Sequence, residues 1–335
     1  MSEKIPVINF LMMCEVILYH CESPDNALAL NAADMRWNDI ITAIVTGPAA
    51  ALCMCWFFAI TGFLLFRNLT FRNLGEKIKS RVLSLFVPYV LWQIIYIVKS
   101  LLQGNFWTFN EIFAQVFLLR IWPPLGAFWY IYTVFLLALL SPIFLLLFRN
   151  EKIGWFSSVL LIVLLYVFWS SIYIGNGKMH YTGNIKTFFP SYVIGAFFGH
   201  ICGNSEDHDK LKYAVGFLLV GVLLDGMGIG DLLSKIAVSV LPVFILFLLP
   251  VPEWSKSRKL YRLNFLIYAT HQSIISLSIN RIRRLILAVV ALVSVANILG
   301  RFLCILLIIA VNAGIHFVMS RLTPKTLKLL TGGRC

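Results

Sequence analysis

The chain has 335 residues, of which 60% are hydrophobic and only 13% are charged, and its net charge is +13. A soluble domain is about 45–50% apolar and about 25% charged, so this composition excludes an ordinary soluble protein and requires lipid as the solvent for most of the chain. The basic residues lie between apolar segments and not along one face with stacking aromatic side chains, which argues against a nucleic-acid partner.

Sliding windows of about 20 residues predict about ten membrane-spanning helices. Gly226, Gly228 and Gly230 interrupt the seventh and eighth apolar segments, and residues 285–295 either prolong the ninth helix or lie at the surface, so nine to eleven spans fit the sequence. The predicted ranges are 5–21, 40–66, 81–101, 125–148, 154–174, 187–202, 212–229, 232–251, 263–280 and 297–319. The predicted fold class is therefore an all-α polytopic integral membrane protein.

The basic residues orient these spans. With ten spans and a cytoplasmic N-terminus, most of the 28 Lys and Arg residues fall in cytoplasmic segments, as the positive-inside rule requires. We therefore expect both termini in the cytoplasm, a transmembrane domain over 1–321 and a short basic cytoplasmic tail over 322–335. Among the outer segments, 103–124 carries Phe106, Phe109, Phe113 and Phe117 at helical spacing, which predicts an amphipathic helix on the outer interface or, alternatively, a lid over a site.

The seven cysteines do not form a metal-binding pattern. They are scattered through mostly apolar segments, without paired CxxC motifs or nearby histidine ligands. We expect them to be small buried hydrophobic residues, and we predict neither a metal site nor a bound cofactor.

Ionisable residues inside predicted spans are candidates for chemistry, because a charge within the bilayer is costly. Asp225 and Arg301 lie near predicted helix ends and are expected to reach the interface. His20 lies in the outer part of the first helix, and His271 lies about 12 Å into the ninth. A neutral imidazole can accept a proton from a hydroxyl group and return it. Glu15 lies five residues before His20, about 140° around the helix, so these two side chains are not expected to form a pair.

Six segments carry a resemblance to a known family through their order and spacing. They are Val16–His20, Phe57–Leu65, Lys79–Trp92, Phe128–Ile131 with Leu140–Pro142, Phe189–Gly195 and Phe265–His271. In this order they resemble the motifs of the acyltransferase-3 family of integral-membrane acyltransferases, over nearly the whole chain.

The resemblance implies transfer of an acyl group, commonly acetyl, from a cytoplasmic acyl-CoA. The implied acceptor is a hydroxyl group of a surface polysaccharide or of a lipid-linked saccharide at the outer face. The implied location is a cell membrane, as a multi-pass protein of the bacterial cytoplasmic membrane. Membrane lipid, acyl-CoA and the saccharide are therefore the expected partners.

The family's first helix carries an Arg followed eleven residues later by a His. This offset places both on one face of the helix, about 16 Å apart. Here His20 matches, but Asn9 occupies the Arg position, and the family's Arg-x-x-Arg reads Arg81 to Ser84. Loss of cations weakens the expected grip on CoA phosphates, because Asn and Ser cannot bind phosphate as an Arg fork does.

The resemblance assigns roles to seven positions. The predicted catalytic residues are His20 and His271, and the predicted substrate-binding residues are Asn9, Arg81, Ser84, Trp129 and Tyr268. Two alternatives to an active enzyme remain at this stage. One is a saccharide or lipid transporter, although the sequence lacks matched halves with interrupted helices, and the other is a catalytically silent relative.

Overall fold

The computed structural model describes residues 3–22, 35–117, 123–168, 180–228, 232–255, 259–290 and 292–334. Within these ranges all regular structure is helical, which confirms the predicted fold class at the level of secondary structure. The chain divides into two compact units. The central unit comprises residues 55–250, and the terminal unit comprises residues 2–54 and 251–335; each is described by itself.

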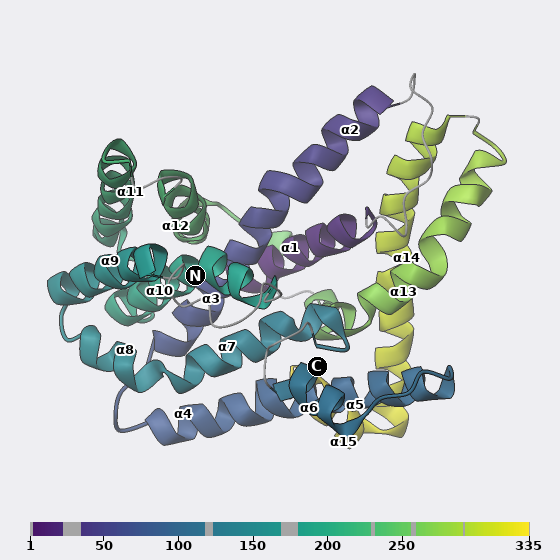
Figure 1. Cartoon of the computed structure of the whole chain (residues 1–335), viewed down its shortest axis with the longest axis horizontal. Helices are drawn as coiled ribbons and strands as arrows, with labels where there is room; N and C mark the ends of the chain where they lie inside the picture. Colours follow the sequence, from purple (N-terminus) through teal and green to yellow (C-terminus); the bar gives the residue numbers. More distant parts are fainter. Residues whose placement is uncertain are drawn as a thin grey trace. The chain divides into compact units, whose positions relative to one another are not determined.

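The terminal unit joins the two ends of the chain. Helix α1 packs against α13 and α14, and α13 and α14 lie side by side over much of their length (Figure 1). Apolar residues of the three helices, including Ile17, Ile275 and Ile308, form a buried core. The helices of this unit are α1 (Lys4–His20), α2 (Met35–Ile44), α13 (Asn264–Leu287), α14 (Val293–Leu322) and α15 (Pro324–Thr331).

The central unit contains the remaining helices. They are α3 (Ala50–Phe66, whose first turn belongs to the terminal unit), α4 (Leu74–Arg81), α5 (Val87–Leu102), α6 (Phe109–Phe117), α7 (Trp129–Leu139), α8 (Ser141–Leu147), α9 (Glu151–Phe168), α10 (His180–Cys202), α11 (Leu211–Gly226) and α12 (Leu232–Leu248). Two π turns, Val45–Ala49 and Val82–Phe86, join α2 to α3 and α4 to α5. Such turns widen a helix without ending it, so each pair runs on as one long helix.

Glycine allows α3 and α10 to pack backbone against backbone. A Cβ atom at Gly195 would lie 2.0 Å from the carbonyl oxygen of Ala59, and one at Gly199 would lie 2.3 Å from that of Phe63. From the other helix, a Cβ atom at Gly62 would lie 2.5 Å from the carbonyl oxygen of Tyr192. This is the small-xxx-small packing that brings helices close together in membranes.

Three described helices are long and apolar enough to cross a membrane: Asn38–Phe66, Leu74–Leu102 and Val293–Leu322. The segment predicted as one span over 125–148 is two helices bent by 53° at a break before Ser141, and it gives a fourth span if the pair is counted as one. Other apolar helices, such as Leu232–Leu248, are shorter. Ten spans therefore stay a prediction, because length and composition of the described helices support only three or four.

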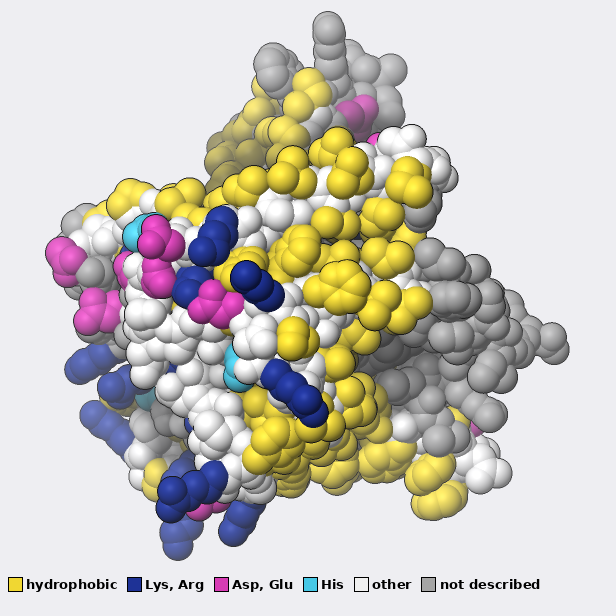
Figure 2. All heavy atoms as spheres, turned by 90° about the vertical axis from the view of Figure 1, so that its left-hand side faces the viewer, with side chains coloured by type: hydrophobic (Ala, Val, Ile, Leu, Met, Phe, Trp, Pro, Cys, Tyr) yellow, Lys and Arg dark blue, Asp and Glu magenta, His cyan; other side chains and the backbone are white. Residues whose placement is uncertain are grey.

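The exposed surface is that of a membrane protein. Large apolar side chains such as Leu102, Leu223 and Leu306 are 84%, 66% and 62% exposed. In Figure 2 hydrophobic side chains cover a broad area, and the Lys and Arg side chains lie toward the left half and the centre of the view. Water disfavours contiguous apolar surface of this extent, whereas lipid accommodates it.

Three local predictions can be compared with the helices. The segment rich in phenylalanine does form a helix, α6, and Phe109 on it is 78% exposed. The ninth predicted helix does extend beyond residue 280, but α13 ends at Leu287 and α14 begins at Val293. Within the basic tail, Pro324 begins the short helix α15.

Candidate active site

His20 and His271 lie next to each other in the terminal unit. His20 is the last residue of α1, and His271 lies two turns into α13. Their ring centroids are 5.0 Å apart and the rings are tilted by 49°. The structure thus brings together the two predicted catalytic residues, which are 251 positions apart in the sequence.

The hydrogen bond made by His271 defines its tautomer. Its Nδ1 atom lies 2.7 Å from the backbone carbonyl oxygen of Tyr268, and a carbonyl can only accept, so Nδ1 carries the hydrogen. In the neutral ring, Nε2 then holds a lone pair. His271 is fully buried, and Nε2 has no hydrogen-bond partner in the described part of the chain. A buried acceptor in this state is ready to receive a hydrogen from a hydroxyl group.

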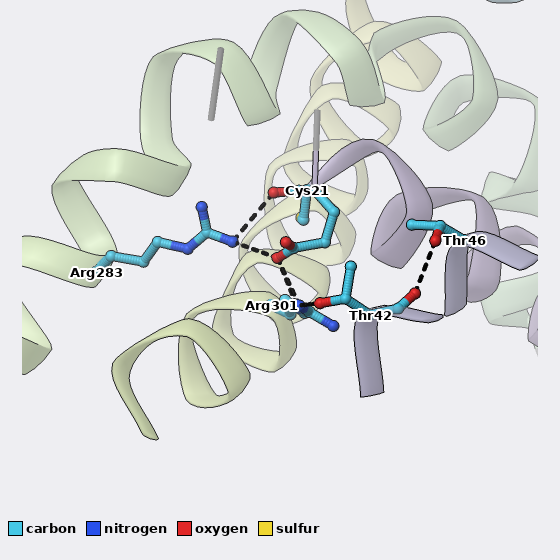
Figure 3. A network of polar contacts seen from close by, with 6 residues as sticks. Cys21, Thr42, Thr46, Arg283 and Arg301 are labelled. Atoms are coloured by element: carbon cyan, nitrogen blue, oxygen red, sulfur yellow. Dashed lines mark hydrogen bonds and ion pairs between the residues drawn. The ribbon is translucent and has the colours of Figure 1, made fainter. Parts of the chain in front are cut away.

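A buried ionic network fixes the end of α1 that carries His20. Arg283 Nη2 donates to the carbonyl oxygen of Cys21 at 3.0 Å and to Glu22 Oε1 at 2.8 Å. Arg301 Nε donates to the same Glu22 oxygen at 2.7 Å, and its Nη2 donates to Thr42 Oγ1 at 2.7 Å. Figure 3 shows the two guanidinium groups converging here from α13 and α14.

This network overturns the prediction for Arg301 and adds two residues to the site. Arg301 was expected to reach the membrane interface, but only 1% of its surface is exposed, because Glu22 and Thr42 satisfy its guanidinium inside the unit. Glu22 and Arg283 were not predicted, since they lie just outside the apolar segments 5–21 and 263–280. The clustering of three arginines at 281–284 directly after a predicted span was the available signal.

Arg81 lies in a second polar cluster, in the central unit. It is the last residue of α4 and is half-buried. Its guanidinium group lies near enough to the phenol groups of Tyr130 and Tyr192 to interact with them electrostatically. Tyr130 donates to the carbonyl oxygen of Phe57 at 3.0 Å, so the 2.6 Å contact with Thr61 is a hydrogen bond donated by Thr61. The buried hydroxyl of Tyr192 has no partner among the described residues. Sequence reasoning found Arg81 but neither tyrosine.

The other predicted substrate-binding residues occupy different surroundings. Trp129 packs in an aromatic cluster, with its ring 5.8 Å from that of Phe58 and 6.1 Å from that of Phe188. Ser84 lies in the π turn that follows Arg81, and Tyr268 supplies the carbonyl that orients His271. Asn9 lies on α1, which is helical without a break to His20, so the predicted alignment of positions 9 and 20 on one face holds.

A family model described as an acyltransferase domain, that of the acyltransferase-3 family, matches residues 7–317. The chain belongs to the acyltransferase-3 family. This membership confirms the resemblance seen in the motifs and makes the protein a membrane acyltransferase that transfers groups other than aminoacyl groups. Both histidines, the ionic network and Arg81 lie inside the matched range. Searches of curated proteins and of solved structures each returned no match.

Proposed function

We propose that this acyltransferase moves an acyl group, with acetyl as the expected case, from a cytoplasmic acyl-CoA to a hydroxyl group of a surface polysaccharide or lipid-linked saccharide. The observation that carries the proposal is the histidine pair, in which the buried Nε2 lone pair of His271 lies beside the ring of His20 and has no hydrogen-bond partner among the described residues. A site that must remove a proton from a hydroxyl group needs such a neutral acceptor.

The reaction requires one proton to move twice. The acceptor oxygen attacks the thioester carbonyl carbon, the new C–O bond forms and the C–S bond breaks. His20 takes the hydroxyl proton as general base and returns it to the departing CoA thiolate. His271 assists by accepting at Nε2 a hydrogen bond from the ring N–H of His20, which orients the other nitrogen of His20 toward the hydroxyl group. General acid–base catalysis of this kind contributes typically about 10²–10⁴-fold to rate.

We assign donor binding to the polar cluster around Arg81. A guanidinium group binds phosphate oxygens in a fork, which suits the diphosphate or ribose phosphate of CoA. Tyr192 adds a buried hydroxyl that lacks a partner within the described residues and can donate to the same phosphate. Asn9 and Ser84 occupy positions where the family has arginine, so Arg81 carries more of the phosphate binding here.

The proposed orientation has both termini in the cytoplasm of a cell membrane. Single cysteines at Glu76 and Lys256 should then react with membrane-impermeant reagents only from the inside, and one at Asn176 only from the outside. Lys256 and Asn176 lie outside the residues that the structure describes. Labelling of Asn176→Cys only from the inside would reverse the orientation and with it the direction of acyl transfer.

Two experiments test the function. The first measures acyl transfer by purified protein in lipid vesicles with isotopically labelled acetyl-CoA. The second compares, by mass spectrometry, the surface glycans of cells with and without the gene. We expect a labelled acetyl ester on the glycan that depends on the protein. Saccharide flux across the vesicle without acyl transfer would instead identify a transporter. Failure of both acyl-CoA hydrolysis and transfer, with folded protein, would identify a silent relative.

A further inference from the structure

Two cysteines from opposite ends of the chain meet in the core of the terminal unit. Cys21 directly follows the last residue of α1, and Cys304 lies on α14. They are 283 positions apart in the sequence, neither is exposed to solvent, and both belong to one buried apolar cluster. Their thiol groups are hydrogen-bonding neighbours. Both are free thiols in this structure.

The packing of α1 against α14 brings these two cysteines together. Ile17 and Cys21 are four residues apart, as are Cys304 and Ile308, and residues at this spacing share one face of a helix. All four belong to the same buried cluster, and α1 and α14 are in contact. The face of α1 that ends at Cys21 therefore packs against the face of α14 that carries Cys304.

A hydrogen bond to α13 orients the second thiol. Ser278 Oγ donates its single hydrogen to the carbonyl oxygen of Ile274 at 2.6 Å. In the 3.8 Å contact between Ser278 Oγ and Cys304 Sγ, the thiol of Cys304 must therefore be the donor. The sulfur of Cys304 is then left to accept the hydrogen of the Cys21 thiol. The two sulfur atoms thus face each other within the core.

A cation lies beside this pair of thiols. Arg283 Nη2 donates to the backbone carbonyl oxygen of Cys21 at 3.0 Å, and its guanidinium group interacts electrostatically with both thiols. Glu22 pairs with Arg283, but it also pairs with Arg301, so one carboxylate is shared by two cations. A cation next to a cysteine favours the thiolate, which is the form that reacts with a disulfide.

We propose that Cys21 and Cys304 are joined by a disulfide bond in the membrane, formed by exchange with an external protein disulfide. In the proposed orientation α1 ends on the outer side of the membrane, where disulfides form and persist. One cysteine thiolate attacks a sulfur of the external disulfide and breaks its S–S bond. The other cysteine then attacks the mixed disulfide, so that the Sγ–Sγ bond forms. The two electrons and the two thiol protons end on the external protein, which leaves as a dithiol.

The bond would fix the part of α1 that carries a predicted catalytic residue. Because neither thiol is exposed, the exchange has to take place before α1 packs against α14. The bond then ties the residue next to His20 to α14 and closes a loop of most of the chain, which restricts the unfolded state. The inference rests on the proposed orientation of α1 but not on acyl transfer.

Peptide mapping of the full chain tests the proposal. The chain is isolated from bacterial membranes, denatured in the presence of N-ethylmaleimide and digested without reductant, so that free thiols are capped and disulfides stay intact. We expect a peptide pair that joins Cys21 to Cys304 and separates on reduction, with N-ethylmaleimide on Cys14, Cys53 and Cys55. N-ethylmaleimide on both Cys21 and Cys304, or a bridge from either of them to another cysteine, would overturn the proposal.

A serine variant measures what the bond contributes. Cys304→Ser keeps a hydroxyl donor for Ser278 but cannot form an S–S bond. We expect it to melt at a lower temperature than the unmodified chain when both are isolated without reductant. This difference should shrink when both are isolated with a trialkylphosphine, with reduction verified by the same mapping.

Cys202→Ser is the matched control, because this cysteine is also buried but lies in the central unit. Its effect on the melting temperature should not depend on the reductant. An effect of Cys304→Ser that is equally independent of the reductant would contradict the disulfide. Neither experiment measures acyl transfer, so failure here leaves the proposed function to its own test.

Discussion

The two units bury polar groups of different kinds. Fully buried polar side chains of the central unit are neutral, and several bond to a nearby backbone carbonyl, as Thr133 does to Trp129 and Ser158 to Gly154. The terminal unit buries two arginines and a histidine. Neutral hydroxyls satisfied within a helix cost little, whereas buried charges are expensive and depend on one another. The polar groups of the central unit are therefore compatible with close packing. In the terminal unit, the burial of charged groups costs stability, and these groups lie beside the pair formed by His20 and His271.

The largest expected effect is on chemistry in the terminal unit. His20→Ala should lower acyl transfer by about 10²–10⁴-fold, with membrane abundance unchanged, because insertion does not depend on one imidazole. His271→Ala should also impair transfer. The measurement is turnover of labelled acetyl-CoA at equal membrane protein level. Unmodified turnover by His20→Ala would remove this residue from the mechanism.

The ionic network should be the most sensitive point for stability. Glu22→Gln leaves two buried arginines without a counter-charge, and removing one partner of a buried ion pair typically costs about 3–5 kcal/mol. Thermal unfolding in detergent measures the loss. Because the altered network also holds the end of α1, acyl transfer by the folded variant should fall as well.

Glu151→Gln supplies the matched control for Glu22. Glu151 pairs with Lys210 at the surface of the central unit, where its side chain is 40% exposed, so its removal should cost less than about 1 kcal/mol. The hydrogen bond from Lys210 lowers the pKa of the Glu151 carboxyl. Its small contribution is therefore present at neutral pH and lost as pH falls through that lowered pKa. Equal destabilisation by the two variants would contradict the contrast between the units.

Close packing should be the weak point of the central unit. Gly195→Ala places a methyl group 2.0 Å from the backbone oxygen of Ala59, and overpacking of this kind typically costs about 1–3 kcal/mol or more. Gly314→Ala in α14 is the control, because a Cβ atom there meets nothing within 4 Å. We expect lowered membrane abundance and thermal stability for the first variant only. Loss of abundance in both would mean that glycine matters for another reason than helix contact.

The effect expected at Asn9 depends on whether this position faces the donor path. If this position still faces the donor path, Asn9→Arg should preserve or raise activity and tighten acyl-CoA binding, because an added guanidinium can meet a phosphate. If it does not, an unpaired charge between packed helices should lower abundance, since charge at membrane depth costs at least about 2.5 kcal/mol. Donor affinity and membrane abundance of Asn9→Arg and Asn9→Ala separate these cases. Unchanged donor binding in both, at normal abundance, would exclude position 9 from the donor site.

The sequence by itself determined the helical class, the apolar character and the family, and it selected the two histidines as candidates. Hydropathy averages over a window and motifs follow local order, so both report on properties that neighbouring residues share. His20 and Arg81 belong to such local motifs, so they could be chosen as candidates before any contact was known. The number of spans stays a prediction, and apolar length alone does not reveal the 53° bend that separates α7 from α8.

Only the tertiary structure decided which distant residues meet. Nothing local to residue 20 or residue 271 states that their rings lie 5.0 Å apart. The sequence near Arg301 also does not show that its guanidinium group pairs with Glu22 inside the unit, and for this reason the prediction of an interfacial Arg301 was wrong. A buried charge is tolerated only where a partner from another helix compensates its lost hydration, and that partner is chosen by packing across the whole unit and not by sequence neighbourhood.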